Sequence, residues 1–212
     1  MNTIAMDHAP ITPSKVVCIG RNYVEHIEEL GNEIPKNMVV FNKPNSAITD
    51  TLHYYGEACR FEGEICLLIQ DGRVAGIGFG LDLTHADIQN ALKAKGLPWE
   101  RAKSFDGSAV LSDFVSFDGD ITCIAFEMRI NGRLVQHASY DLMMYKPDEM
   151  IAEINRFMTL EDGDVIMTGT PKGVGYYHLG DVFEAQVTCG EKTVLRTQWV
   201  CVKFESHPKV RR

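Results

Sequence analysis

The sequence lacks the features that define several protein classes. No run of apolar residues approaches the roughly eighteen that a membrane-spanning helix needs, so no membrane association is expected. Its 21 lysines and arginines are outnumbered by 29 acidic residues, which gives a net charge of −8. The basic residues cluster only in the terminal segment 209–212, which we interpret as a solvated tail. A nucleic-acid-binding surface requires clustered positive charge, so nucleic acid is not an expected partner.

Secretion signals and metal-binding cysteine motifs are also missing. The first fifteen residues include Asp7 and His8 and contain no apolar core of a signal peptide. None of the six cysteines has C-x-x-C spacing, and Cys66 and Cys123 lie inside apolar runs. We therefore predict buried free thiols in place of disulfides or zinc ligands, and a reducing, cytoplasmic location.

The composition is that of an ordinary globular protein. Hydrophobic residues make up 45% of the 212 residues and charged residues 24%, without an internal repeat or a low-complexity linker. This length is sufficient for a substantial core without disulfide bonds. We predict an N-terminal extension over residues 1–14 and a single catalytic domain over residues 15–212.

Short strands dominate the pattern. Asp71-Gly72 and Asn131-Gly132 predict two β-hairpins, each between apolar runs. The strands predicted are Lys15–Ile19, Met38–Phe41, Phe61–Ile69, Val74–Phe79, Ile121–Ile130, Leu134–His137, Asp164–Thr168, Val182–Val187 and Val194–Phe204. The helices predicted are Tyr23–Leu30, Thr84–Lys95 with a capping box at Thr84 and Asp87, and Pro147–Phe157. Because strands and helices do not alternate, the pattern indicates an α+β domain with a mixed or rolled sheet, not a doubly wound one.

Three carboxylates are candidates for a metal site. Glu62 and Glu64 are two residues apart on one predicted strand, so both side chains should leave the same face. The strand continues as an apolar run, which predicts burial on both sides. Asp82, between two leucines, could complete an oxygen site for a divalent cation. The alternative is that the two glutamates are solvated at the start of a half-buried strand and that Asp82 is a residue near a helix start.

Other polar residues could supply catalytic groups. His26 and Glu29 are three apart on a predicted helix and could activate water as a dyad, although two solvated residues would have the same spacing. Lys103 could stabilise an enolate or oxyanion, or simply be solvated. The loop over residues 169–175 contains three glycines but not the order of a P-loop. Its backbone N–H groups and the Thr170 hydroxyl could approach an anion, or the loop could be only a tight connection.

The order of these motifs along the chain resembles the fumarylacetoacetate hydrolase family, and in particular its small single-domain acylpyruvases. The resemblance extends from Lys15 to the C-terminus. It rests on the following segments: Gly20-Arg21-Asn22-Tyr23 with His26 and Glu29, Lys43-Pro44, Phe61-Glu62-Gly63-Glu64, Leu81-Asp82-Leu83-Thr84, Gly96-Leu97-Pro98-Trp99 with Lys103, and Thr168-Gly169-Thr170-Pro171-Lys172-Gly173.

The resemblance implies a mixed β-roll, usually a homodimer, that acts on a small 2-oxo acid. The implied roles are Mg²⁺ or Mn²⁺ ligands, with Ca²⁺ as a possible substitute in vitro (Glu62, Glu64, Asp82), a water-activating dyad (His26, Glu29), a cation over the reacting carbonyl (Lys103) and substrate contacts (Arg21, Asn22, Gln89, Thr170).

The resemblance also implies a reaction, with alternatives. The first expectation is hydrolysis of a carbon–carbon bond in acylpyruvates such as fumarylpyruvate. The same site would support decarboxylation or keto–enol tautomerisation of oxaloacetate, and a 2-oxo acid hydratase or a non-catalytic metal-stabilised binding protein are further alternatives.

Two departures from the family pattern affect these expectations. The family often has Thr-x-Arg-Asp after the metal-binding Asp, whereas Ala86 replaces the arginine here. Carboxylate recognition then needs another residue, for which His85 and Arg21 are candidates. In addition, no helix is expected between Glu64 and Asp82, where relatives usually have one, so the loop bordering the site should be short.

Overall fold

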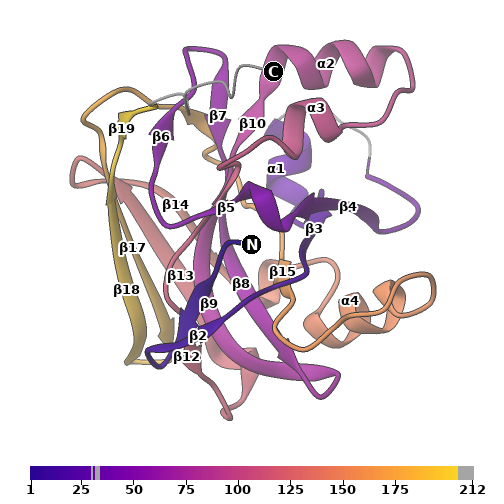
Figure 1. The fold of residues 1–212 in the computed structure, drawn as a ribbon, viewed down its shortest axis with the longest axis vertical. Coiled ribbons are helices and arrows are strands. Elements are labelled where there is room, and N and C mark those ends of the chain that lie inside the picture. The colour runs from indigo at the N-terminus through magenta and orange to yellow at the C-terminus, as the bar shows by residue number, and fades with distance from the viewer. Residues whose placement is uncertain (30, 32–33, 205–212) are drawn as a thin grey trace.

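The computed structural model describes residues 1–29, 31 and 34–204. The predicted tail at 209–212 and the predicted helix end at residue 30 lie outside these residues. A curved, mixed eight-stranded sheet forms the centre of the molecule (Figure 1). Its strands, in spatial order, are β4 (Val39–Pro44), β3 (Lys15–Gly20), β15 (Val165–Met167), β8 (Gly63–Gln70), β9 (Arg73–Asp82), β11 (Ala109–Leu111) and β5 (Ile48–Thr49), with β12 (Val115–Ser116) beside β9.

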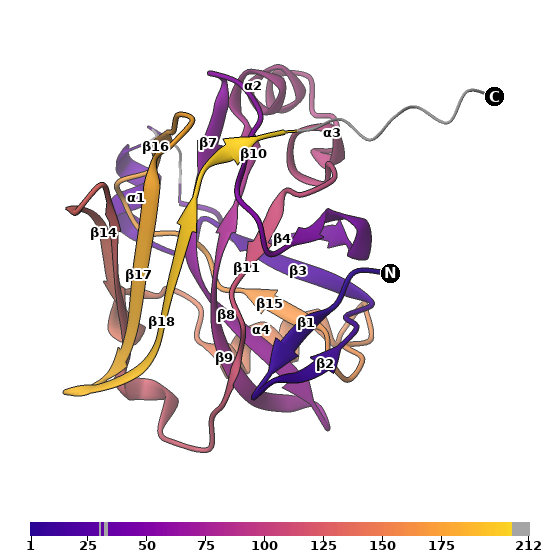
Figure 2. The same cartoon turned by 60° about the vertical axis from the view of Figure 1, so that its left-hand side comes forward.

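A four-stranded antiparallel sheet packs against this curved sheet (Figure 2). Its order is β14 (Arg133–Ser139), β13 (Ile124–Ile130), β17 (Val182–Cys189) and β18 (Lys192–Val200). The main apolar core lies between the two sheets, where the ring of Phe79 on β9 is 4.9 Å from that of Phe126 on β13. The two layers form the curled half-barrel of a rolled sheet, which confirms the predicted fold class.

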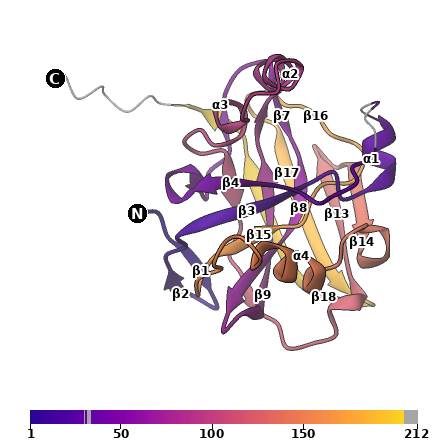
Figure 3. The same ribbon diagram turned by 90° about the vertical axis from the view of Figure 1, so that its right-hand side faces the viewer.

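Short strand pairs and helices complete the fold. Three small sheets pair β10 (Thr84–His85), β7 (Cys59–Phe61) and β16 (Gly175–Tyr176); β1 (Ile4–Met6) and β2 (Ala9–Ile11); and β19 (Val202–Lys203) and β6 (His53–Tyr54). The helices are α1 (Val24–Glu29), α2 (Ala86–Ala94), α3 (Glu100–Lys103) and α4 (Pro147–Ile154), and they lie along one side of the sheets (Figures 1 and 3). Among the described residues, every helix is too short or too polar to span a bilayer.

Both predicted hairpins are confirmed. The β8–β9 turn has positive φ at Asp71 (51°) and Gly72 (70°), and the β13–β14 turn has it at Asn131 (52°) and Gly132 (79°). Two consecutive positive φ angles match the right-handed twist of the flanking strands, and Asn, Asp and Gly adopt them most easily. The β8–β9 hairpin also runs directly from Glu64 to Asp82 without an inserted helix, as predicted.

The predicted helix start at Thr84 is wrong. Thr84 and His85 form β10, which pairs with Arg60 and Cys59 of β7, and the helix begins at Ala86. No side chain caps it, so the proposed capping box does not form. The local Thr-x-x-Asp pattern is overridden because strand pairing with a distant segment uses the backbone of these two residues.

The prediction that Glu62 and Glu64 share one strand is also wrong. The strand predicted over Phe61–Ile69 is divided, because β7 ends at Phe61 and pairs within the small three-stranded sheet. β8 begins at Gly63 and belongs to the large sheet. Glu62 lies between the two strands, and its carbonyl oxygen accepts a 2.8 Å hydrogen bond from the N–H of Asp82. Simple strand alternation therefore does not position this carboxylate.

Two cysteines form a disulfide, contrary to the prediction of six free thiols. Cys123 precedes β13 and Cys189 ends β17, and the antiparallel pairing of these strands brings their Cα atoms to 4.7 Å. The remaining cysteines are buried and free, as predicted: Cys18, Cys59, Cys66 and Cys201. Because the reducing location was deduced from unpaired cysteines, the disulfide removes that support.

Candidate active site

The side chains of interest meet in one pocket beside α1 and α2. It is lined by the ends of β3 and β9, the β7–β8 junction, both of these helices, α3 and the loop after β15. Eight of the ten residues predicted as a metal, catalytic or substrate site line it, and Asn22 and Glu29 stand outside its lining. The residues that line it are Ile19, Gly20, Arg21, His26, Ile27, Phe41, Arg60, Glu62, Glu64, Asp82, Gln89, Lys93, Trp99, Lys103 and Thr170.

Three carboxylates converge at the base of the pocket. Glu62, Glu64 and Asp82 each offer an oxygen, and these oxygens all lie within 4.8 Å of one another. Their residues are only 8%, 2% and 1% exposed, so the alternative of solvated glutamates is wrong. The β8–β9 pairing explains the convergence, because the first residues of β8 lie opposite the last residues of β9.

Two buried lysines neutralise part of this negative charge. Lys103 Nζ lies 2.8 Å from Glu62 Oε2 and 2.7 Å from Asp82 Oδ2. Lys43 Nζ lies 2.8 Å from Asp82 Oδ1, and it also donates to the carbonyl oxygen of Lys103. Lys103 was predicted as a site residue. Lys43 was given no role. It is the only buried residue of the edge strand β4, so no local pattern marks it, but a fully buried ammonium needs a charged partner.

The pKa shifts show an excess of negative charge. Burial raises the pKa of Glu62, but the positive charge of Lys103, which also donates a hydrogen bond, outweighs it and lowers that pKa to about 2. Burial lowers the pKa of Lys103, but Asp82 and Glu62 outweigh it and raise that pKa above its usual value. For Glu64, burial and repulsion by Asp82 and Glu62 all raise the pKa well above normal.

This donor set fits a hard divalent cation. Three carboxylates face two ammonium groups, and the third carboxylate, Glu64, has no lysine beside it among the described contacts. Its Oε2 accepts only a 2.7 Å hydrogen bond from the N–H of Gly169 in the described structure. A divalent cation would supply the charge that Glu64 lacks, and carboxylate oxygens are the ligands that Mg²⁺, Mn²⁺ and Ca²⁺ prefer.

The predicted dyad is assembled on α1. His26 Nδ1 lies 3.3 Å from Glu29 Oε2, and the imidazole is buried in the pocket wall. Glu29 is also held from the other side, because both of its carboxylate oxygens accept the N–H of Gly173, at 3.0 and 3.2 Å. The spacing of three residues therefore places a carboxylate behind the histidine, as a dyad requires.

The glycine-rich loop after β15 serves the carboxylates. Gly169 donates its N–H to Glu64. Glycine is necessary at this position because φ is 95° and because an added Cβ would lie only 2.8 Å from the Cβ of Asn22. The hydroxyl of Thr170 donates to the carbonyl oxygen of Gly63, between the two glutamates, at 3.0 Å. The loop is thus a tight connection that also contributes a backbone N–H, but to a protein carboxylate.

Asn22 and Gln136 hold this loop in place. The Asn22 amide donates to the carbonyl oxygens of Thr168 (2.8 Å) and Tyr145 (3.1 Å) and accepts the N–H of Tyr145 (2.7 Å), so it fixes backbone segments. Gln136, which the sequence did not single out, accepts the N–H of Gly63 (2.9 Å) and donates to the Thr170 hydroxyl (2.8 Å). It comes from β14 of the second sheet, so no local pattern reveals it.

Cationic and amide groups also line the pocket. Arg21, in a left-handed conformation (φ 58°), is joined there by Arg60, Lys93 and Gln89. Burial and the nearby positive charge of Arg21 lower the pKa of Lys93 to about 8. Two cations that the sequence did not predict, Arg60 and Lys93, therefore lie beside Arg21 and Gln89, and this concentration of positive charge favours an anionic ligand.

The two candidates for replacing the family arginine are placed differently. Arg21 lines the pocket. His85 does not, because its ring packs 4.2 Å from that of Phe105 and against Tyr55. Burial also lowers the pKa of His85, which disfavours the charge that carboxylate binding requires.

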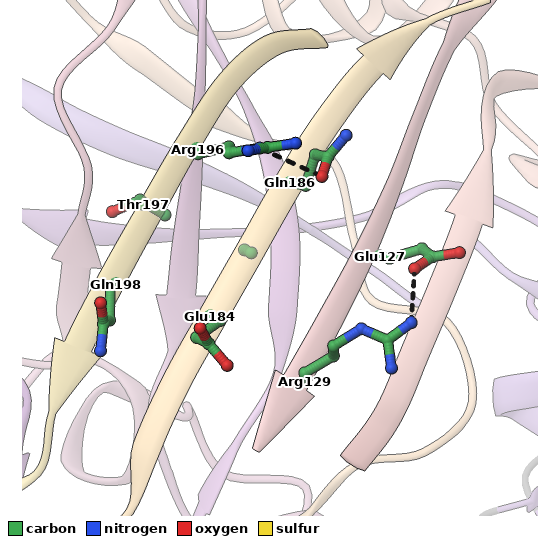
Figure 4. A pocket seen from close by; sticks show the side chains of 8 residues that line it. Glu127, Arg129, Glu184, Gln186, Arg196, Thr197 and Gln198 are labelled. Atoms are coloured by element: carbon green, nitrogen blue, oxygen red, sulfur yellow. Dashed lines mark hydrogen bonds and ion pairs between the residues drawn. The ribbon is translucent and has the colours of Figure 1, made fainter. Parts of the chain in front are cut away.

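Another pocket lies on the outer face of the four-stranded sheet, away from these groups (Figure 4). Two contacts join side chains that line it: Arg129 lies 3.0 Å from Glu127, and Arg196 donates to Gln186 at 3.2 Å. Both arginines are exposed, and no cluster of potential metal ligands was found there among the described residues. The buried pocket is therefore the candidate active site.

A rolled sheet that holds a buried carboxylate triad beside a His–Glu dyad provides a place where a divalent cation could be bound next to a general base. Residues 15–198 match the family described as fumarylacetoacetate (FAA) hydrolase C-terminal, and the chain belongs to this family of enzymes.

The relatives include proteins named for oxaloacetate chemistry. The chain is 37% identical over 187 residues to oxaloacetate tautomerase YcgM of Escherichia coli K12, covering 79% of this chain and 85% of the relative. It is 35% identical over 190 residues to the mitochondrial oxaloacetate tautomerase FAHD1 of Bos taurus, covering 81% and 86%.

A solved structure supports the fold comparison. The chain superposes on fumarylpyruvate hydrolase from Pseudomonas aeruginosa, determined in complex with Mn²⁺ and pyruvate, with a TM-score of 0.85. The identity is 25%, and 96% of each chain is covered.

Proposed function

We propose that this protein is a divalent-metal-dependent oxaloacetate keto–enol tautomerase. The observation that carries the proposal is the buried triad, which adjoins cationic groups in a pocket suited to a small anion. The tautomerases among the relatives favour this reading over the acylpyruvate hydrolysis expected first from the sequence.

The reaction requires only proton transfers. One proton leaves C3 of the keto form and one joins the C2 oxygen, so that C2=O becomes C2–OH and a C2=C3 double bond forms. No water attacks and no carbon–carbon bond breaks. The barrier is therefore set mainly by the charge that develops on the C2 oxygen.

The chain's own residues meet this requirement as follows. Glu62, Glu64 and Asp82 would hold Mg²⁺ or Mn²⁺, which supplies Lewis acidity toward a carbonyl oxygen when bound. Lys103 remains protonated between Glu62 and Asp82 and places a fixed positive charge beside the developing oxyanion. Because the reaction needs no activated water, and the C3 proton, acidified by the polarised carbonyl beside it, can pass to solvent water, the His26–Glu29 dyad is not essential to it.

The experiment compares Lys103→Met and His26→Gln on oxaloacetate, by following the ultraviolet absorbance of the enol with Mn²⁺ or with EDTA. We expect Lys103→Met to reduce kcat at least about a hundredfold, as removal of an oxyanion-stabilising donor does, and His26→Gln to reduce it by less than about tenfold. Lys95→Met, an exposed lysine after α2, is the matched control. A wild-type rate no higher than that of Mn²⁺ alone would contradict the proposal.

A second candidate is acylpyruvate hydrolysis, which the intact dyad favours. His26 and Glu29 are placed as a water-activating pair, and the structural neighbour is named a fumarylpyruvate hydrolase. If this were the principal activity, cleavage of acetylpyruvate would exceed oxaloacetate turnover. It would also fall about 10²- to 10⁴-fold in His26→Gln, as loss of a general base does.

Decarboxylation of oxaloacetate is the third outcome, and it is recognised by release of pyruvate. The homodimer inferred from the sequence remains part of the proposal, and gel filtration tests it. The cytoplasmic location no longer has support from unpaired cysteines, and cell fractionation tests it.

A further inference from the structure

We propose that Arg60 binds the second carboxylate of the substrate and so makes the site selective for dicarboxylic 2-oxo acids. The inference rests on the proposed function, because it assumes that the other end of the substrate lies at the carboxylate triad. It concerns recognition, however, and is tested separately from turnover.

The guanidinium of Arg60 is enclosed in the pocket, and part of its N–H donors have no hydrogen-bond partner among the described residues. Its side chain is 13% exposed, and its Nε is buried without a hydrogen-bond partner among the described residues. Its Nη2 lies 3.5 Å from Gln89 Oε1, at the limit of a hydrogen bond, and 3.9 Å from Glu62 Oε1, which is a loose ion pair. A buried donor without a partner costs about 1–3 kcal/mol, so an anion that satisfies it binds favourably.

The position of Arg60 is fixed by its strand. It lies on β7, the middle strand of the small sheet, where it pairs with Thr84 of β10 on one side and Tyr176 of β16 on the other. The backbone is therefore held on both edges, and only the guanidinium needs to adjust. Because a guanidinium presents parallel N–H groups, it can bind a carboxylate through two hydrogen bonds.

The spacing suits a short substrate with two carboxylates. The carboxylate of Glu62 contacts Arg60 through one oxygen and Lys103 through the other, so the guanidinium lies next to one of the three proposed metal ligands. A four-carbon acid that is chelated through its C1 carboxylate and C2 oxygen would direct its C4 carboxylate out of the triad. Lys93 and Arg21 add positive charge to the same pocket.

Arg60 also explains how the pocket could bind a carboxylate although Ala86 replaces the arginine that the family often has at this position. Ala86 is 2% exposed and carries no charge, but it starts α2 directly after the strand that pairs with β7. Its N–H donates to the carbonyl oxygen of Ala58, two residues before Arg60. The guanidinium absent from α2 is thus available from the adjacent strand, and His85, which packs against Phe105, is not needed.

The test measures equilibrium binding to the Mn²⁺-loaded protein by calorimetry. L-malate and L-lactate are the probes, since they share the 2-hydroxy acid end and differ in the second carboxylate. We expect Arg60→Gln to weaken malate binding by about tenfold to a hundredfold, as loss of hydrogen bonds to a charged group does, and to leave lactate and Mn²⁺ binding within about twofold. Arg60→Lys should restore part of the malate affinity, because it keeps the charge but not the fork.

Controls separate recognition from other effects. Arg129→Gln removes an exposed arginine from the outer sheet and should change nothing. If Arg60→Gln weakened malate and lactate equally, or weakened Mn²⁺ binding instead, Arg60 would be only a counter-ion of Glu62 and the proposal would be overturned. Because malate and lactate are not turned over by tautomerisation, the result stands whether or not oxaloacetate is the substrate.

In turnover, the corresponding comparison uses oxaloacetate and its 4-methyl ester. Arg60→Gln should raise KM for oxaloacetate and leave kcat and the ester's KM nearly unchanged. A fall in kcat for both compounds would overturn the assignment, since it would place Arg60 at the reacting atoms or in the folding of the site.

Discussion

Replacement of Gln136 by methionine tests how the second sheet supports the active site. Gln136 is 1% exposed, and its side chain joins Gly63, between Glu62 and Glu64, to the loop that holds Glu64. Methionine has a similar length and no hydrogen-bonding amide. The substitution therefore removes the polar connection while largely preserving the volume.

The expected cost follows from the groups left without a partner. The N–H of Gly63 loses its 2.9 Å acceptor and the carbonyl oxygen of Pro171 loses its 3.0 Å donor. The Thr170 hydroxyl keeps its own donation to Gly63. Each orphaned buried group costs about 1–3 kcal/mol, so unfolding should become easier by about 3 kcal/mol once the apolar burial of methionine is allowed for. For a chain of this length, this corresponds to a fall in Tm of about 6–12 °C.

Metal binding should weaken as well. Gly63 separates two of the three proposed ligands, and residues that orient metal ligands typically contribute about 10- to 100-fold in affinity. Urea unfolding measures the stability and calorimetric titration with Mn²⁺ measures the affinity. Gln198→Met, an exposed glutamine on β18, is the control. A stability loss below about 1 kcal/mol with unchanged Mn²⁺ affinity would refute this account of Gln136, since it is less than the cost of one orphaned group.

Three further results are expected. With a pKa of about 8, Lys93 is charged below that pH and neutral above it, so kcat/KM for an anionic substrate should fall as pH rises through 8. Lys93→Arg should remove that fall, and an unchanged pH profile would contradict the assignment. Mn²⁺ at about 100 times its Kd should add about 2.7 kcal/mol of stability, which is measured as a rise in Tm. Asp82→Asn should abolish this rise, and a rise of the same size in the variant would refute the proposed metal site. Thiol titration of the unfolded, unreduced protein should find four free cysteines, and six after reduction, whereas six thiols before reduction would contradict the disulfide. Replacing Cys123 and Cys189 with serine should lower the free energy of unfolding by about 2–4 kcal/mol.

The sequence by itself determined the parts that depend on local chemistry. The Asp-Gly and Asn-Gly pairs have few favourable conformations besides a tight hairpin turn, and the turn between Asp71 and Gly72 fixes which residues of β8 and β9 meet. This pairing brings Glu64 and Asp82 together. The three-residue spacing of His26 and Glu29 is likewise set within one short helix.

Only the tertiary structure decided which distant segments would be neighbours. Gln136, Lys43 and Arg60 lie on three different strands, β14, β4 and β7. They contact Gly63, Asp82 and Gln89, respectively, and the two residues of each pair are distant in the sequence. The Cys123–Cys189 pair exists because β13 and β17 are adjacent. Nothing in the residues around any of these positions distinguishes them from ordinary strand residues, because strand pairing is fixed by the burial of the whole apolar face and not by a local pattern.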